Sequence, residues 1–423
     1  MTDEVPYDPA QRVSYSSLTL HRQCPQAWAY RYVRGLDRVG SAVARDLGSW
    51  WHLVRAMDSL QRGLAMDSLR SVPRKLSTGD NDLRLTLATS DLTSNIPIPA
   101  AGSKYRLPNG KTLPVSSEVA IAISAAWWRT LSGEDKDAWV EESGEPLPDR
   151  LAAMETRYVA RWADDFASEV PIAVEHKFER DVPNGSGAVL PGFVDLIYLD
   201  TRRNLVVVRD AKSNKALAAA DAADDLSDSQ THLYAWGVQP DVQEWGLGPV
   251  TALSYDRARS AMPKQPSLTQ AGALSKSVTD YDLATYREFA AGPDGQGVSW
   301  GEEETYVKTG KRAGEPKWGR YVEDPVLVEK LSSPSALSIW HQRTLTPVNY
   351  NIVSTHLRSV SSTQVEAKRT VLAMAEHGEA PRNFNRLLCS WCDFNKLCRA
   401  EMIGGVEGTY DPSDYGLTER PKK

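Results

Sequence analysis

Four cysteines are the residues whose spacing says most about chemistry in this chain of 423 residues. Cys389, Cys392 and Cys398 lie close together near the C-terminus, whereas Cys24 lies near the N-terminus. Sites with four thiolates hold zinc or iron–sulfur clusters. Four unrelated buried thiols would not explain why three of them cluster. We therefore predict one metal centre that joins the two ends of the chain, and the spacing alone leaves zinc and iron–sulfur both open.

An acid and a lysine follow a strongly apolar segment over residues 205–210. Asp210 and Lys212 are two positions apart, so both side chains lie on the same face of an extended strand. A carboxylate there can hold a divalent cation while the ammonium steadies the attacking water or the charge that develops on a phosphate. A solvated charge pair would look the same in isolation. Asp195 favours the metal site, because hairpin pairing would bring it beside Asp210.

Other elements offer side chains to the same site. Gln230 and Tyr234 share one face of a predicted helix over residues 227–238, although an ordinary contact between helix and sheet is the alternative. His52 lies in a predicted helix over residues 43–64, and its imidazole would suit Mn²⁺ as well as Mg²⁺. Its alternative is a hydrogen-bonded core histidine. Glu175 is a weaker candidate acid on the first predicted strand, and its alternative is a surface acid.

The elements that must position these side chains follow from periodicity and turn residues. Apolar residues recur at three- and four-residue steps over residues 148–168, which predicts an amphipathic helix. Short segments rich in Val, Ile and Phe predict strands over residues 172–180, 192–199, 205–210 and 250–256. Helices are predicted over residues 13–34, with a break at Pro25, and over residues 325–378.

A polar stretch over residues 257–324 contains a basic segment that also carries tryptophan. Such a segment could contact single-stranded DNA by charge and stacking, and a solvated loop is the alternative. The net charge of −6 gives no global attraction to phosphates, so nucleic-acid binding would need a local basic surface of this kind. The candidate contacts are Lys308, Lys311, Arg312, Lys317, Trp318 and Arg320.

Composition is that of a soluble globular protein, with 41% hydrophobic and 25% charged residues. The longest nearly apolar run, residues 119–128, is far shorter than a membrane span. We therefore expect a cytoplasmic protein without membrane contacts.

The order of the motifs resembles RecB-type nucleases of the PD-(D/E)XK superfamily, especially the iron-staple branch with Cas4-like and AddB-like exonucleases. The matching positions run from an opening cysteine helix, through a metal histidine, two acids with a lysine and a Gln-x-x-x-Tyr helix, to three closing cysteines. They are Cys24, His52, Asp195, Asp210, Lys212, Gln230, Tyr234, Cys389, Cys392 and Cys398.

The resemblance implies an α/β fold with a restriction-endonuclease-like core, in which helices flank a mixed central sheet. It implies Mg²⁺ or Mn²⁺ held by His52, Asp195, Asp210 and the main-chain carbonyl of Ala211, and a [4Fe–4S] cluster on the four cysteines. It further implies exonuclease cleavage of single-stranded DNA or DNA ends in recombination, repair or processing. A helicase or recombination protein is the kind of partner that it suggests.

We therefore expect one nuclease domain over residues 1–404, with a flexible tail over residues 405–423. Its expected parts are an N-terminal helix with the first cluster cysteine, a helical region with an insertion, the catalytic sheet, a polar arm, and helices with the cysteine segment: residues 13–38, 39–169, 170–256, 257–324 and 325–404. Two rival functions are a non-catalytic DNA-binding or assembly protein and a zinc-stapled interaction module.

Overall fold

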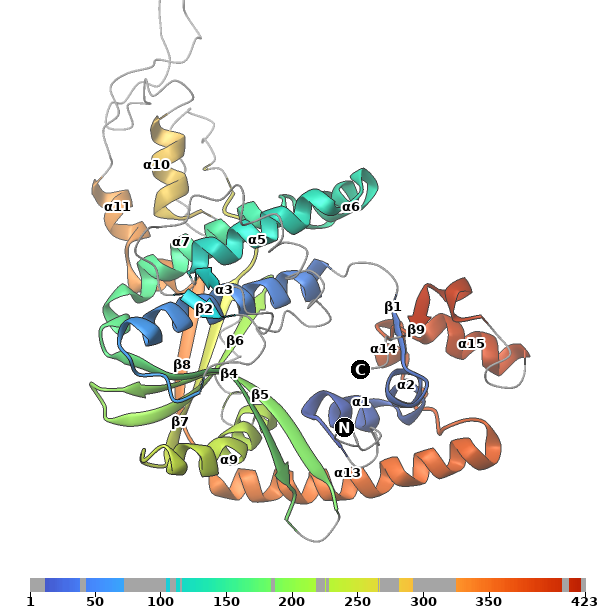
Figure 1. The fold of residues 1–423 in the computed structure, drawn as a ribbon. Helices are drawn as coiled ribbons and strands as arrows, with labels where there is room; N and C mark the ends of the chain where they lie inside the picture. The colour runs from blue at the N-terminus through green and yellow to red at the C-terminus, as the bar shows by residue number, and fades with distance from the viewer. Residues whose placement is uncertain are drawn as a thin grey trace, which may run out of the picture.

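A computed structural model describes residues 12–38, 43–71, 104–106, 112–114, 116–183, 187–217, 225, 228–264, 266, 281–291, 325–404 and 411–419. Its centre is a five-stranded mixed sheet with the strand order β4-β5-β6-β7-β8 (Figure 1). The strands are β4 (Glu169–Asp181), β5 (Val189–Asp200), β6 (Leu205–Asn214), β7 (Val250–Arg259) and β8 (His341–Pro347).

The sheet forks between β5 and β6. These two strands pair only from Leu196 opposite Arg209 to Asp200 opposite Leu205. Beyond that point β5 continues with β4 as a two-stranded arm, whereas β6 continues in parallel beside β7. The β6–β7 pair is the parallel one; β4–β5, β5–β6 and β7–β8 are antiparallel. Backbone groups of β5 and β6 are thus freed at the fork for contacts other than sheet pairing.

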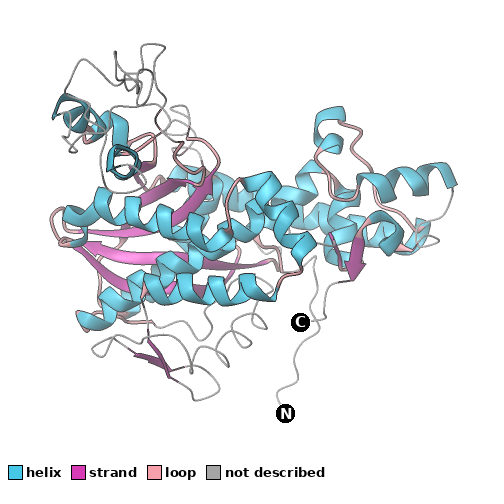
Figure 2. Ribbon diagram, turned by 90° about the horizontal axis from the view of Figure 1, so that it is seen from above, coloured by secondary structure: helices cyan, strands magenta, loops and turns pink. Residues whose placement is uncertain are grey.

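Helices cover both faces of the sheet (Figures 1 and 2). The core on one face combines Val174, Leu196 and Val207 with helices α3, α5 and α7, whose apolar stripes include buried tryptophans. The core on the other face combines Val194 and Val208 with α9 and α13. The bounds of these helices are α3 (Val43–Ala65), α5 (Ser117–Thr130), α7 (Leu147–Phe166), α9 (Ser229–Glu244) and α13 (Tyr350–His377).

The two ends of the chain meet in a lobe beside the sheet (Figure 1). The backbone N–H of Gln26 donates to the Pro381 carbonyl at 3.0 Å, and the N–H of Ala380 donates to Oε1 of Gln26 at 2.7 Å. Strands β1 and β9 also pair, with Asp37 opposite Thr418. The elements of this lobe are α1 (Tyr15–Gln23), α2 (Pro25–Trp28), η1 (Ala29–Val33), β1 (Leu36–Arg38), α14 (Arg386–Ser390), α15 (Asn395–Gly404), η2 (Pro412–Tyr415) and β9 (Leu417–Glu419).

Six further elements complete the described structure. They are β2 (Lys104–Arg106), β3 (Thr112–Pro114), α6 (Gly133–Ser143), α10 (Leu283–Ala291), α11 (Pro325–Leu331) and α12 (Pro334–Leu337). Trp139 of α6 belongs to the core that α3, α5 and α7 form on one face of the sheet. Within the described part of the chain, no helix is both long enough and apolar enough to cross a membrane.

The predicted helices and strands around the site are confirmed, including the break of the first helix at Cys24. Two predictions differ from the structure. The sequence predicts helix over residues 325–378, but β8 interrupts it, because this strand is held by buried ion pairs of Arg343 and has little apolar alternation. The sequence also predicts a flexible tail over residues 405–423, but Leu417–Glu419 pair with β1 and Leu417 is buried against Leu36.

Gly237 gives a test of how α9 docks on the β4–β5 arm. A Cβ atom there would come within 2.2 Å of the Phe178 ring, which is buried and cannot move away freely. We expect Gly237→Ala to lower the free energy of unfolding by about 1–3 kcal/mol, measured by urea denaturation, because overpacking displaces the ring. Gly248→Ala is the control, since no atom lies within 4 Å of its added Cβ. Equal stability of the two variants would contradict this packing.

Candidate active site

The fork between β5 and β6 brings two acids from different strands together. Asp195 and Asp210 are the first residues beyond the last paired positions, Leu196 and Arg209. The backbone N–H of Ala211, which no longer pairs with β5, donates to Oδ2 of Asp195 at 2.7 Å. This hydrogen bond links β5 to β6 at the base of the fork. It holds Oδ2 of Asp195 and leaves Oδ1 for another partner.

Glu175 reaches the same place from β4. Val174 pairs with Leu196 and His176 pairs with Val194, so Glu175 lies across from Asp195 in the register. Its φ of 47° is left-handed, which is uncommon for a residue other than glycine. Such a conformation costs on the order of 1–3 kcal/mol and tends to occur at functional sites. The sequence suggested Glu175 only weakly, because nothing local indicates this backbone conformation.

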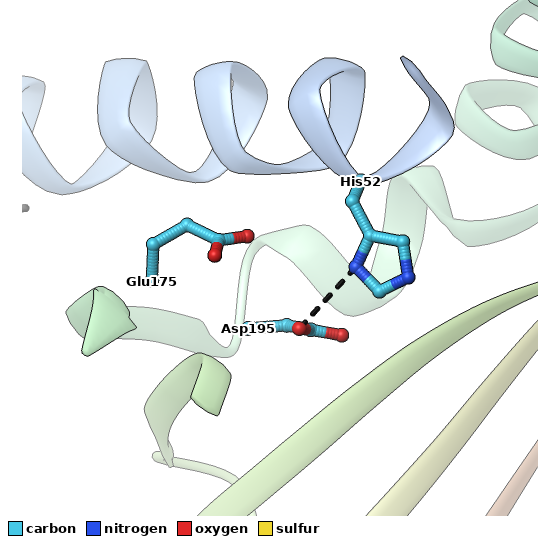
Figure 3. A group of neighbouring side chains, drawn as sticks. All are labelled: His52, Glu175 and Asp195. Atoms are coloured by element: carbon cyan, nitrogen blue, oxygen red, sulfur yellow. Dashed lines mark ion pairs between the residues drawn. The ribbon is translucent and has the colours of Figure 1, made fainter. Parts of the chain in front are cut away.

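His52 comes from α3, above the strands. Its Nδ1 lies 3.3 Å from Oδ1 of Asp195, and Figure 3 shows both side chains together with Glu175 below the helix. One ligand atom from each of these three residues lies within 4.8 Å of the others. An imidazole and two carboxylates suit a divalent cation such as Mn²⁺ or Mg²⁺. The donor set therefore fits the metal that the sequence predicted, with Glu175 as a member.

The electrostatics of this group are those of ligands crowded together. Burial raises the pKa of Glu175 to about 8, and the nearby charge of Asp195 adds to this effect. Burial disfavours the charged form of His52, but Asp195 and Glu175 outweigh it and raise the pKa of His52 to about 9. Burial also acts against the charge of Asp195, but His52 and Lys212 lower its pKa. Near neutral pH, Glu175 and His52 are thus both protonated. These two protons supply the positive charge that a bound cation would otherwise supply.

Asp210 and Lys212 form the second half of the site. The Nζ of Lys212 lies 3.0 Å from Oδ1 of Asp210. Burial raises the pKa of Asp210 to about 6; Lys212 opposes this rise and Asp195 adds to it. Burial acts against the charge of Lys212, but Asp210 and Asp195 raise its pKa above the usual value. Lys212 is therefore an ammonium at neutral pH. Asp210 lies beside the three-ligand group and not within it.

Gln230 and Tyr234 lie on α9. Asp228 caps the N-terminus of this helix, and its side chain accepts from the N–H of Thr231. The Nε2 of Gln230 donates to the Tyr234 hydroxyl at 3.2 Å. Burial raises the pKa of Tyr234, and the charge of Asp210 raises it further. Gln230 and Tyr234 thus share a helix face as predicted, and Tyr234 is close enough to Asp210 and Lys212 for their charges to matter.

A buried network of charged groups lies behind the fork, and the sequence did not indicate it. Arg209 donates to both carboxylate oxygens of Glu169, at 2.9 and 2.6 Å. Arg343 of β8 bonds Glu169 and Asp256, each at 2.9 Å. Burial would raise the pKa values of these two acids, but Arg209 and Arg343 lower both to about 2. These ion pairs join β6, β7 and β8 to β4, and they give each buried arginine a carboxylate partner.

The four cysteines line one cavity of about 570 Å³ in the lobe, although they come from opposite ends of the chain. Cys24 lies at the break between α1 and α2, Cys389 in α14, and Cys398 in α15. Burial raises the pKa values of Cys392 and Cys398, and Arg382, which hydrogen-bonds Cys398, opposes the rise there. The cavity and its thiols fit a metal centre held by both ends of the chain.

The basic segment of the predicted polar arm lies outside the described residues. This applies to all of its candidate DNA contacts: Lys308, Lys311, Arg312, Lys317, Trp318 and Arg320.

A comparison with models of protein families gives a match over most of the chain. A model of the PD-(D/E)XK nuclease superfamily matches residues 12–399. This span includes all four cysteines and the residues at the fork, which are His52, Glu175, Asp195, Asp210 and Lys212. No curated protein matches the chain by sequence.

The pKa values of the fork predict how metal binding depends on pH. Glu175 is protonated below about pH 8, and His52 is protonated below about pH 9. Because a cation must displace these protons, its apparent affinity should rise with pH. Between pH 6 and 8 we expect the Mn²⁺ association constant to rise about ten- to hundred-fold per pH unit, since one or two protons leave for each cation bound. Calorimetry in buffers of different ionisation enthalpy would count the protons released.

Glu175→Gln provides the corresponding variant. It should bind Mn²⁺ more weakly and release one proton fewer, because one ligand and one displaceable proton are removed together. Glu288→Gln, which changes an exposed acid of α10, should behave like the unchanged protein. An affinity that does not vary with pH would contradict this ligand set.

Proposed function

The chain belongs to the PD-(D/E)XK nuclease superfamily, and from this premise we propose that it is a metal-dependent deoxyribonuclease that degrades single-stranded DNA from its ends. The observation that carries a catalytic role is the convergence of His52, Glu175 and Asp195 within 4.8 Å, next to the Asp210–Lys212 pair. A protein that only bound DNA would not need partly buried acids to be held so close together, because each adds to the repulsion between them.

The residues at the fork have separate tasks in this proposal. His52, Glu175 and Asp195 hold Mg²⁺ or Mn²⁺, with Asp210 and the Ala211 carbonyl as further candidate ligands. When bound, the cation supplies charge to the scissile phosphate and acidifies water for the attack. Ala211 keeps Asp195 oriented through its N–H, so that the carboxylate does not have to reorganise when substrate arrives.

Lys212 is the protein side chain that offers positive charge to the reacting groups. Asp210 holds the ammonium at 3.0 Å, and its pKa of about 6 leaves it ionised at neutral pH. Lys212 can therefore donate hydrogen bonds to the attacking water or to a phosphate oxygen as charge develops there. Tyr234 and Gln230, which are hydrogen-bonded to each other, flank this pair on α9 and would position the DNA strand.

We further propose that the cysteines hold a [4Fe–4S] cluster. Among the described residues, the thiols do not form a group of three whose sulfurs all lie within 4.8 Å of one another. Four sulfurs around one zinc, at about 2.3 Å each, would be about 3.8 Å apart, so the wider spacing favours a cluster. Arg382 beside Cys398 suits the negative charge of ligated thiolates.

Recombination, repair or another form of DNA processing is the setting that this chemistry suits. A helicase or recombination protein would supply single strands to such an enzyme. The resemblance of the motifs to RecB-type nucleases supports this setting and this kind of partner.

End-labelled DNA tests the proposed activity. Single-stranded DNA labelled separately at its 5′ and 3′ ends should be degraded with Mg²⁺ or Mn²⁺, and the label released first reports the polarity. Asp210→Ala should abolish cleavage. Lys212→Met should lower kcat by about 10²–10³-fold while Mn²⁺ still binds, because the ammonium acts on the developing charge. Binding of DNA without cleavage by the unchanged protein would favour the non-catalytic rival.

Colour and iron content test the cluster. Anaerobically purified protein should be brown and contain iron, and it should absorb broadly at about 400 nm. Cys398→Ser should lose iron and also lower the thermal midpoint, because the centre ties the last segment to the first helix. A colourless protein that contains zinc without iron would assign the site to zinc.

A further inference from the structure

Exposed apolar side chains gather around the mouth of the cysteine-lined cavity. Trp391 is 83% exposed and Phe384 is 74% exposed, and both line this cavity together with Leu388 and Met402. Leu387, one position before Leu388 in α14, is also exposed. Single exposed apolar side chains are common, but a group around one hollow marks a binding surface. Two of these side chains are aromatic rings that a flat ligand could cover.

The same surface carries positive charge. Arg386 and Arg399 line the cavity and are exposed, and within the described part of the chain neither has an acidic partner. Three acids of the lobe are paired with arginines: Asp393 with Arg31 at 3.3 Å, Glu401 with Arg34 at 2.9 Å, and Glu379 with Arg382. In a chain with a net charge of −6, this is a local basic surface of the kind that attracts phosphates.

We propose that this surface, the Trp391 face, binds single-stranded nucleic acid outside the catalytic fork. The Trp391 face consists of Phe384, Arg386, Leu387, Leu388, Trp391, Arg399 and Met402. Bases stack on Trp391 and Phe384, because every base offers a π-face, and the cations follow the phosphates. The proposal rests on the proposed function, since the strand held here is the one that the fork cleaves.

Charge and ring content favour a nucleic acid over a protein partner. An apolar protein surface would bury the aliphatic side chains, but it would leave Arg386 and Arg399 at its rim without compensating charge. A polyphosphate strand satisfies the cations and covers the rings at once. Figure 1 shows α14 and α15 in the lobe beside the sheet, so the Trp391 face would hold a part of the strand other than the scissile phosphate.

Binding without Mg²⁺ or Mn²⁺ isolates this surface from catalysis. The full-length protein with its cysteine-held metal centre would be titrated into fluorescein-labelled oligothymidylate in EDTA, and anisotropy would report the Kd. Trp391→Ala should raise the Kd about 5- to 150-fold, which corresponds to the loss of one stacked base. Leu372→Ala is the matched control, because Leu372 is 68% exposed on α13 but lies outside the Trp391 face. It should leave the Kd unchanged.

Two further variants separate stacking from a loss of structure. Trp391→Phe should retain most of the affinity, and Arg386→Gln with Arg399→Gln should reduce the slope of log Kd against log salt by about 0.7 for each phosphate that is no longer neutralised. Absorption of the metal centre and circular dichroism would show whether each variant is intact.

The outcomes separate this inference from the proposed function. If intact Trp391→Ala and arginine variants bind like the unchanged protein, the Trp391 face is no nucleic-acid site and a protein partner becomes its occupant. If the face variants lose binding but the unchanged protein never cleaves, the inference stands and the nuclease proposal falls. If the unchanged protein cleaves and the face variants bind normally, only the inference is overturned.

Discussion

The crowding of buried and partly buried carboxylates at the fork is the constraint to which the rest of the structure responds. Glu175, Asp195 and Asp210 lie close enough that each raises the cost of ionising its neighbours, and burial adds to that cost. His52 and Lys212 are the positive groups placed among them. A divalent cation bound among these groups would take the place of their protons, so its binding competes with protonation.

The sheet supplies the geometry for this crowding. Strand β5 leaves β6 just where Asp195 and Asp210 occur, so the backbone hydrogen bonds of a continuous sheet do not fill the space. The left-handed backbone of Glu175 directs a third acid into the gap. Behind the fork, Arg209 and Arg343 pair with Glu169 and Asp256 and thereby join four strands. The strands of the fork are thus held by charge as well as by apolar packing.

In the lobe with the cysteines, the constraint is the loss of chain entropy when distant segments are joined. Helices α1 and α2 and the segment from α14 to β9 lie far apart in the chain, and bringing them together has an entropic cost that grows with the loop they close. Backbone bonds of Gln26 and the pairing of β1 with β9 offset part of that cost. A metal centre on four thiols would offset more of it, while leaving the apolar rim around Trp391 open to solvent.

Local spacing was enough for the sequence to indicate the Asp210–Lys212 pair, the Gln230–Tyr234 face, the cysteine motif and most helices and strands, because each depends on the periods of two or 3.6 residues or on neighbours in the chain. Only the tertiary structure decided that Glu175 joins His52 and Asp195, since that depends on strand pairing and on one left-handed residue. Strand β8 escaped the sequence because its stability comes from ion pairs of Arg343 with residues far away in the chain. Exposure is likewise a property of the folded chain: no pattern around Trp391 distinguishes a buried ring from one that faces solvent.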